Sequence, residues 1–158
     1  NKHFSKMSKN RLFYILFFIF IISCGYQPIF QKKDINFKIN EIIATGDNKA
    51  NYTLINNLKS FNKSENFLNV YDLVINSNKT RQIASKDTKG NPKTYKLNLV
   101  VEIKVYLNKE IKTTEFYDKS FYYNNIDSKF ELSQYEETVL NNLLENISQE
   151  FLFKLQAL

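Results

Sequence analysis

Residues capable of covalent or acid–base chemistry are few in this sequence of 158 residues. Its only cysteine is Cys24, its only histidine is His3, and its three glycines are Gly25, Gly46 and Gly90. Beyond the first 23 residues there is therefore no imidazole for a triad or a zinc site, no second thiol for a disulfide, and no glycine-rich loop for a phosphate. This inventory predicts a protein that is not an enzyme and has no metal site.

Two adjacent carboxylates, Glu136 and Glu137, are the one pairing that acid–base catalysis could use. Adjacent residues on a helix point in different directions. Glutamates in the first turn of a helix also suit the helix dipole. We therefore expect these two residues to lie on a helix surface and not to form a catalytic pair.

The single cysteine follows a segment with the features of a secretory signal. Residues 1–23 carry four cations and no acid, and residues 12–22 (LFYILFFIFII) are all apolar. About twenty apolar residues are needed to span a bilayer, whereas a basic segment followed by an apolar run of about 7–15 residues is typical of a signal peptide. Met7 is a candidate start of this leader, and a retained signal anchor is the alternative.

The sequence Ile21-Ile22-Ser23-Cys24 resembles the lipobox of bacterial prelipoproteins. This resemblance implies cleavage between Ser23 and Cys24, a diacylglycerol on the Cys24 thiol and an N-acyl chain such as palmitate on the new amino group, with no other cofactor. A single acyl chain binds a bilayer only marginally, which is why such anchors carry more than one. Gly25 in place of Asp after the cysteine implies delivery to the outer membrane, facing the periplasm. An ordinary buried thiol is the alternative reading of Cys24.

The net charge of +6 comes mostly from the leader. Without residues 1–23, the chain has 18 of the 22 cations and all 16 acids, so it is nearly neutral. The large positive charge that usually indicates nucleic-acid binding is therefore absent from this part of the sequence. The remaining chain can bury about two-thirds of its unfolded surface, which suffices for one core. We expect a cleaved signal peptide over 1–23, a lipidated tether over 24–34 and a single α+β domain over 35–158.

The elements that would position a site follow from the periodicity of apolar residues. Residues 35–43 and 67–76 have strand composition, and residues 95–107 alternate strictly between apolar and other side chains. Residues 108–110 form a short reversal, so 111–123 should pair with the preceding strand as a hairpin. Residues 77–94 are polar, with Gly90-Asn91-Pro92 as a turn signal.

Two helices are predicted. One covers residues 48–62 with Asp47 as its N-cap, and the other is the C-terminal segment, in which apolar residues recur every four positions from 135 to 155. The start of the second helix is open, because Ser128 and Ser133 are each followed three residues later by Glu. The order β-α-β-β-β-α predicts an α+β two-layer sandwich, a four-stranded sheet with both helices packed on one face, because that arrangement buries every apolar stripe.

Together these features resemble the LPS-assembly lipoprotein family LptE, in the small form found in alphaproteobacteria. The resemblance covers residues 21–158 and rests on the lipobox running into CGYQPIF, the order of elements, the polar segment with Gly90 before Tyr95-Lys96-Leu97, and the closing amphipathic helix. It implies a plug and assembly partner of the outer-membrane β-barrel LptD, in a 1:1 complex that carries lipopolysaccharide to the outer leaflet.

The resemblance also implies contact with lipopolysaccharide through basic residues. The candidates are Arg81, Lys86, Lys89 and Lys93, of which Lys86 and Lys89 lie in the matching segment before Gly90. Such cations would pair with lipid phosphates, Arg bidentately and Lys as a point charge. A second basic position expected near the start of the last helix is not matched, and lysines that merely solvate an exposed loop are the alternative.

Five aromatic residues fall within eight positions: Phe116, Tyr117, Phe121, Tyr122 and Tyr123. Aromatic side chains are enriched at interface cores, so they are candidates for the surface that meets LptD. A half-buried final strand explains them equally well.

The main alternative function is a free-standing, periplasm-facing lipoprotein that binds or carries a lipid or a small ligand. Such a carrier would need a cavity between the sheet and the helices, whereas a plug would not.

Overall fold

The computed structural model describes residues 37–61 and 67–158. The expected signal peptide, the lipidation and cleavage positions Ser23 and Cys24, and the tether over 24–34 lie outside these residues. The described elements occur in the predicted order β-α-β-β-β-α and are β1 (Phe37–Gly46), α2 (Asn48–Ser60), β2 (Asn69–Lys86), β3 (Pro92–Leu107), β4 (Glu110–Asn124) and α3 (Lys129–Leu155).

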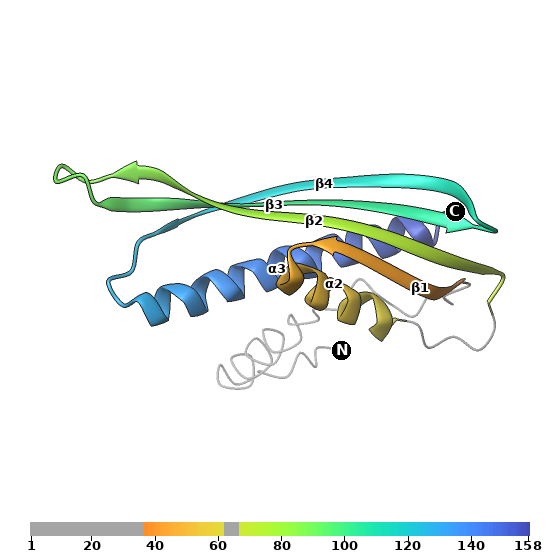
Figure 1. Ribbon diagram of the computed structural model, residues 1–158. Coiled ribbons are helices and arrows are strands. Elements are labelled where there is room, and N and C mark those ends of the chain that lie inside the picture. Colours follow the sequence, from red (N-terminus) through yellow and green to blue (C-terminus); the bar gives the residue numbers. More distant parts are fainter. Residues whose placement is uncertain (1–36, 62–66) are drawn as a thin grey trace, which may run out of the picture. The chain divides into compact units, whose positions relative to one another are not determined.

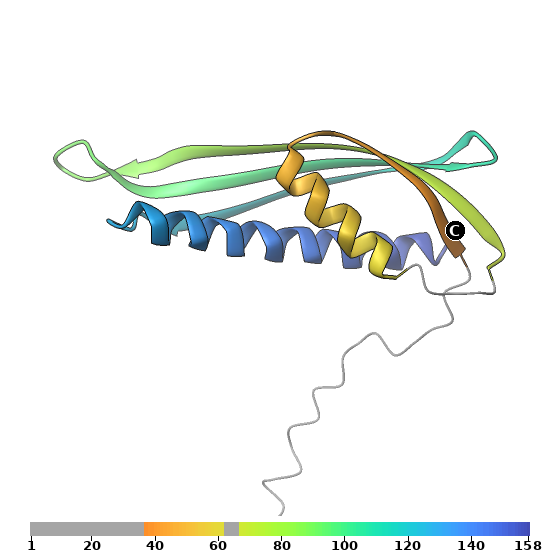
Figure 2. The same cartoon turned by 60° about the horizontal axis from the view of Figure 1, so that its bottom comes forward.

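The four strands form one sheet in the order β1-β2-β3-β4, so β1 and β4 are its edges. β1 and β2 run parallel, and the β2–β3 and β3–β4 pairs are antiparallel. The parallel pair requires a crossover between its strands, and α2 lies in that connection. Both helices lie on the same side of the sheet, as predicted (Figures 1 and 2).

The helices cover this face because every second residue of the strands is apolar. In β3 the buried side chains alternate with partly exposed ones along almost the whole strand, so one face supplies the core. The opposite face, here called the open face, carries no helix among the described residues. The buried residues of β3 are Tyr95, Leu97, Leu99, Val101, Ile103 and Val105.

The start of α3 is decided by Ser128. Its hydroxyl oxygen accepts a hydrogen bond from the backbone N–H of Glu131 at 3.3 Å, so the earlier of the two candidate caps is the one used. The apolar stripe of α3 packs on the sheet from Leu132 to Leu155. Tyr135, which was expected within this stripe, is instead half-exposed. No helix of the described segments is both long and apolar enough to cross a bilayer.

The junction between β1 and α2 is fastened to the middle of β2. Asp47 is the N-cap of α2, as predicted, and its carboxylate accepts a hydrogen bond from the N–H of Ala50 at 2.8 Å. The N–H of Asp47 donates to the carbonyl of Ser77 at 3.0 Å, and the buried hydroxyl of Ser77 donates to Asn51 at 2.8 Å. Gly46 has φ +99°, and a Cβ there would lie 1.8 Å from the carbonyl oxygen of Ser77. Only glycine fits this approach.

The polar segment 77–94 is mostly strand, which corrects the shorter strand predicted over 67–76. β2 continues to Lys86 and pairs with β3 back to Pro92, leaving only a turn between them. Backbone pairing needs no apolar side chains, and both faces are largely exposed here, so the sequence shows no alternation. This end of the β2–β3 hairpin runs past the start of α3 (Figure 2).

Candidate functional site

Three of the four predicted lipopolysaccharide-binding cations lie at the end of the β2–β3 hairpin. Lys86 is the last residue of β2, Lys89 lies in the turn, and Lys93 is the second residue of β3; all three are exposed. None of their ammonium groups forms an ion pair with another described residue. We call these three residues the hairpin tip, and their charges are free to meet an anion.

The turn that carries the hairpin tip is built around Asp87. Its carboxylate accepts hydrogen bonds from the N–H of Asn91 at 2.8 Å and the N–H of Lys89 at 2.9 Å. The hydrogen bond from Asn91 is the largest influence on this carboxyl, and together these bonds hold the pKa of Asp87 below its ordinary value. Asp87 therefore stays ionised, and one fixed negative charge stands among three cations.

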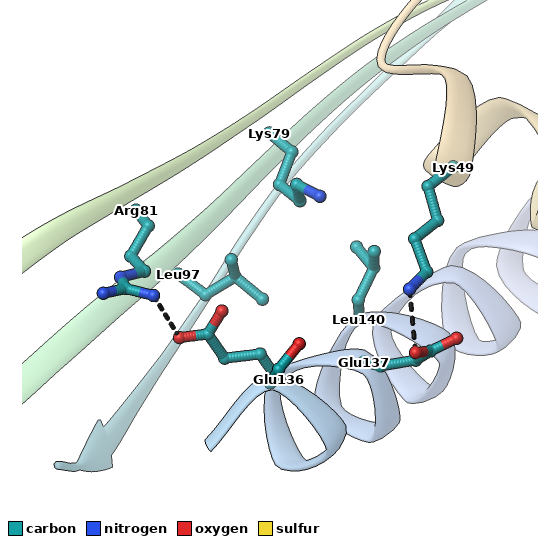
Figure 3. Close-up of a pocket in the computed structure, with 8 residues that line it drawn as sticks. Lys49, Lys79, Arg81, Leu97, Glu136, Glu137 and Leu140 are labelled. Carbon is teal, nitrogen blue, oxygen red and sulfur yellow. Dashed lines mark hydrogen bonds and ion pairs between the residues drawn. The ribbon is translucent and has the colours of Figure 1, made fainter. Parts of the chain in front are cut away.

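Arg81 differs from the hairpin tip because its charge is already paired. Its side chain lies on the helix-covered side of β2, and its Nη1 is 2.8 Å from Oε1 of Glu136 on α3 (Figure 3). The guanidinium also lies 4.3 Å from the ring centroid of Tyr95, a cation–π distance. Arg81 could bind lipid phosphate only in competition with Glu136, so of the four cations it is the least available.

Glu136 joins the sheet to α3 through a second contact. The hydroxyl of Tyr123 donates to Oε1 of Glu136 at 2.8 Å. Burial raises the pKa of Tyr123, and the hydrogen bond and charge of Glu136 raise it further, so the hydroxyl remains a donor at neutral pH. The ring of Tyr123 also stacks on Tyr95, with centroids 5.7 Å apart. We call Arg81, Tyr95, Tyr123 and Glu136 the Glu136 cluster.

A pocket of about 130 Å³ lies beside the Glu136 cluster. Its cations are paired: Lys49 with Glu137 at 2.8 Å and Lys79 with Asp47 at 3.4 Å, besides Arg81. Ligand pockets for drug-sized molecules usually have about 300–1,000 Å³ and mostly apolar walls, so this one suits water or a small anion better than an acyl chain. The lining residues are Lys49, Lys79, Arg81, Leu97, Ser133, Glu136, Glu137 and Leu140.

The two adjacent glutamates hold different cations, since Glu136 faces Arg81 and Glu137 faces Lys49 (Figure 3). Among residues 37–61 and 67–158, no group of three or more His, Cys, Asp or Glu side chains is arranged to hold a metal ion. Sequence reasoning missed the partners of Glu136, because nothing in the local pattern links residue 81 to residue 136.

The five aromatic residues of β4 do not form one surface, which corrects that prediction. Tyr117 and Tyr123 are only 4% exposed and belong to the core. Phe116 and Tyr122 lie on the open face, 68% and 59% exposed, and Phe121 lies at the margin of the helix-covered face. The reason is the period of two along a strand, which sends neighbouring side chains to opposite faces. A partner can reach Phe116, Phe121 and Tyr122.

Solved structures with a similar arrangement include bacterial lipoproteins. Rare lipoprotein B from Shewanella oneidensis matches with a TM-score of 0.55 at 17% identity, over 75% of this chain and 95% of that one. An uncharacterized lipoprotein B from Nitrosomonas europaea gives 0.54 at 14% identity, over 84% and 91%. A minor lipoprotein from Acinetobacter baumannii gives 0.54 at 12% identity, over 78% and 92%. The chain has the fold of these lipoproteins.

The likeness concerns the fold and nearly the full length of each solved chain. At 12–17% identity it carries no residue-by-residue correspondence. No protein-family model and no curated protein matches the sequence.

Proposed function

We propose that this protein is an outer-membrane lipoprotein of the LptE kind, which acts as plug and assembly partner of the LptD β-barrel in lipopolysaccharide transport to the outer leaflet. One observation carries the proposal. The fold shared with bacterial lipoproteins begins at Phe37, thirteen residues after a lipobox that ends at Cys24. In this proposal diacylglycerol and an N-acyl chain on Cys24 hold the protein in the outer membrane on its periplasmic side.

The role is binding and assembly, not catalysis. The described side chains support this, because the ionisable groups of the Glu136 cluster hold strands and helix together in closed pairs. A catalytic acid or base needs a proton to exchange with a substrate and a place for that substrate.

The hairpin tip is the proposed contact for lipopolysaccharide. Its three ammonium groups form no ion pair in the part of the chain that the structure describes. They stand at one end of the sheet, where phosphates of a lipid headgroup can approach them. Arg81 is a secondary contact, because Glu136 must first release it.

The open face and edge of β4 are the proposed contact with LptD. β4 is an edge strand whose outer side is unpaired among the described residues. Phe116 and Tyr122 stand on its open face, and large exposed aromatic side chains of this kind are favoured at interface cores.

The test is to solubilise outer membranes in mild detergent and purify the protein through a C-terminal tag. We expect a stoichiometric partner that runs as a large, heat-modifiable β-barrel, and mass spectrometry of the tagged chain should find an acylated Cys24. If the protein is acylated and membrane-bound but elutes alone, the LptD partnership is wrong.

The free-standing carrier would then be the better function, and a co-purifying lipid or small ligand would identify its cargo. The pocket beside the Glu136 cluster is too small and too highly charged to hold a lipid acyl chain.

A further inference from the structure

Several large apolar side chains are exposed at one end of the sheet. This end, here called the proximal end, contains the starts of β1 and β2 and the β3–β4 turn, since Phe37 pairs with Asn69 and Tyr71 pairs with Leu107. The C-terminal end of α3 lies at the same end (Figures 1 and 2). The exposed apolar residues here are Phe67 (41%) and Leu68 (84%), which directly precede β2, Val70 (40%) of β2 and Ile111 (58%) of β4.

Val70 and Ile111 point to the same side of the sheet. Ile111 pairs with Tyr106 of β3, and Tyr106 pairs with Asp72 of β2. Paired residues share a face, and Val70 is two positions from Asp72, so it shares the open face with Ile111. The two apolar side chains therefore belong to one surface that spans β2 to β4.

Lysine side chains lie at the same end of the sheet as these apolar side chains. The Nζ of Lys38 lies 5.4 Å from the ring centroid of Phe67. Lys109 stands at the tip of the β3–β4 turn with φ +70°, and Lys112 is exposed just after it, with Glu110 as the acid between them. Lysine stems can lie along an apolar surface while their ammonium groups reach lipid phosphates. Exposed apolar groups with lysines beside them are typical of surfaces that enter the membrane interface.

The length of the chain before β1 limits how far this end can be from an anchor at Cys24. Thirteen residues lead from Cys24 to Phe37, and they span at most about 45 Å even when fully extended. β2, with 18 residues, extends over about 59 Å. An anchor at Cys24 therefore holds the start of β1 within about 45 Å of the bilayer surface, where tethering raises the effective concentration of even a weak contact.

We propose that, in the acylated chain that is not enclosed by a barrel, the proximal end rests on the headgroup–acyl boundary of the membrane, with Leu68 and Ile111 inserted and Lys38 and Lys109 on the phosphates. This arrangement rests on the proposed lipid anchor at Cys24, and it turns the hairpin tip away from that bilayer surface.

The test uses single thiols in the full acylated chain. Cys24 is the only cysteine, so in the acylated protein Leu68→Cys or Ile111→Cys introduces the only free thiol. Each variant is labelled with an environment-sensitive fluorophore and placed in vesicles of phosphatidylethanolamine and phosphatidylglycerol, with and without bromine on the acyl chains. Ser85→Cys, exposed near the hairpin tip, is the matched control.

We expect brominated lipid to reduce the fluorescence at positions 68 and 111 about twofold or more, and to leave position 85 nearly unchanged, because only inserted probes meet the acyl chains. Equal quenching at 68 and 85, or none at 68, would overturn the membrane contact.

Failure of the anchor and failure of the surface give different results. If the parent protein reacts with a maleimide, Cys24 is not acylated and the proposed function loses its anchor. The Leu68→Cys probe is then measured in a Cys24→Ser background. Quenching by brominated lipid would mean that the proximal end contacts the membrane without an anchor, and no quenching would mean that it does not. If the parent does not react and the probe at 68 is unquenched, the anchor stands and the proposed surface is wrong.

Discussion

Asp47 combines two roles in one carboxylate. It caps α2, and it lies 3.4 Å from Lys79 of β2. Partial burial raises its pKa, but the hydrogen bond from Ala50 and the charge of Lys79 together outweigh this, so the pKa lies below the ordinary value of 3.8. A carboxyl whose pKa is lowered by folding stabilises the folded state above its unfolded pKa, and this contribution is lost as the pH falls towards the folded pKa.

We predict that Asp47→Ala lowers the free energy of unfolding by about 1 kcal/mol at pH 7, the usual cost of losing a cap. The loss should shrink as the pH falls below about 3.8, because the unfolded chain then takes up a proton that the folded carboxyl, with its lower pKa, binds only at a still lower pH. Asp47→Asn keeps a capping oxygen and should cost less than Asp47→Ala at neutral pH. Urea unfolding followed by circular dichroism at pH 7 and pH 3 measures these differences. An Asp47→Ala cost that is unchanged at pH 3 would contradict the charge argument.

Gly46 and Gly90 form a natural pair for a test of backbone fit. Both have positive φ, +99° and +87°, but a Cβ at Gly46 would strike the backbone of Ser77, whereas a Cβ at Gly90 would meet no heavy atom within 4 Å. Gly46→Ala should therefore cost about 3 kcal/mol or more, and Gly90→Ala only about 1 kcal/mol. Similar midpoints of urea unfolding for the two variants would show that the approach to Ser77 is not tight.

At the scale of elements, the Glu136 cluster holds the β-sheet to the start of α3. Tyr123→Phe removes one hydrogen bond to Glu136 and should lower the free energy of unfolding by about 1 kcal/mol. The neighbouring Tyr122→Phe is the control, because Tyr122 lies on the opposite face and its hydroxyl has no hydrogen-bond partner among the described residues. Equal effects of the two substitutions on thermal unfolding would contradict this account.

For the hairpin tip we predict an effect on lipopolysaccharide binding and almost none on stability. Replacing Lys86, Lys89 and Lys93 by Gln should change the free energy of unfolding by less than about 0.5 kcal/mol, since all three are exposed and none forms an ion pair with another described residue. In the proposed function it should weaken binding to lipopolysaccharide about tenfold or more, because each lysine near an anionic lipid surface contributes roughly 1 kcal/mol.

The control for the hairpin tip changes the net charge equally at another place. It replaces the exposed Lys49, Lys59 and Lys154 by Gln. The affinity of each variant for lipopolysaccharide is measured by fluorescence titration at low and high salt. The difference between the two variants should shrink at high salt, because salt screens exposed charges. If both variants weaken lipopolysaccharide binding equally, binding depends on the net charge of the protein and not on the position of the hairpin tip.

The whole molecule has a covered face, which holds the core, and an open face, which the proposed function gives to LptD. Phe116→Ala with Tyr122→Ala should leave stability nearly unchanged but reduce co-purification of the barrel severalfold, because exposed aromatic anchors contribute most to binding. Tyr52→Ala with Phe130→Ala removes two equally exposed aromatics from the helices and is the control. If this control reduces the yield of barrel as much, the contact lies on the helix side.

Much of the architecture was predictable because it depends on residues close together in the chain. The alternation over 95–107 identifies an inner strand, Asp47 marks the start of α2, and the reversal at 108–110 makes a hairpin. The start of α3 was narrowed to Ser128 or Ser133, and the structure uses Ser128. The extension of β2 through 77–86 was not predictable in the same way. Its strand is held by backbone hydrogen bonds to β3, which leave no pattern in exposed side chains.

The sequence by itself determined the order of elements, the α+β class and the lipobox resemblance at Cys24, since each is a matter of local period, cap or motif. Only the tertiary structure decided that Arg81 is held by Glu136, while Lys86 and Lys89 form no ion pair within residues 37–61 and 67–158. It also decided that Leu68 is exposed. These outcomes depend on which residues of the strands lie opposite a helix. Contacts between segments that are far apart in the sequence decide this, so no local pattern can show it.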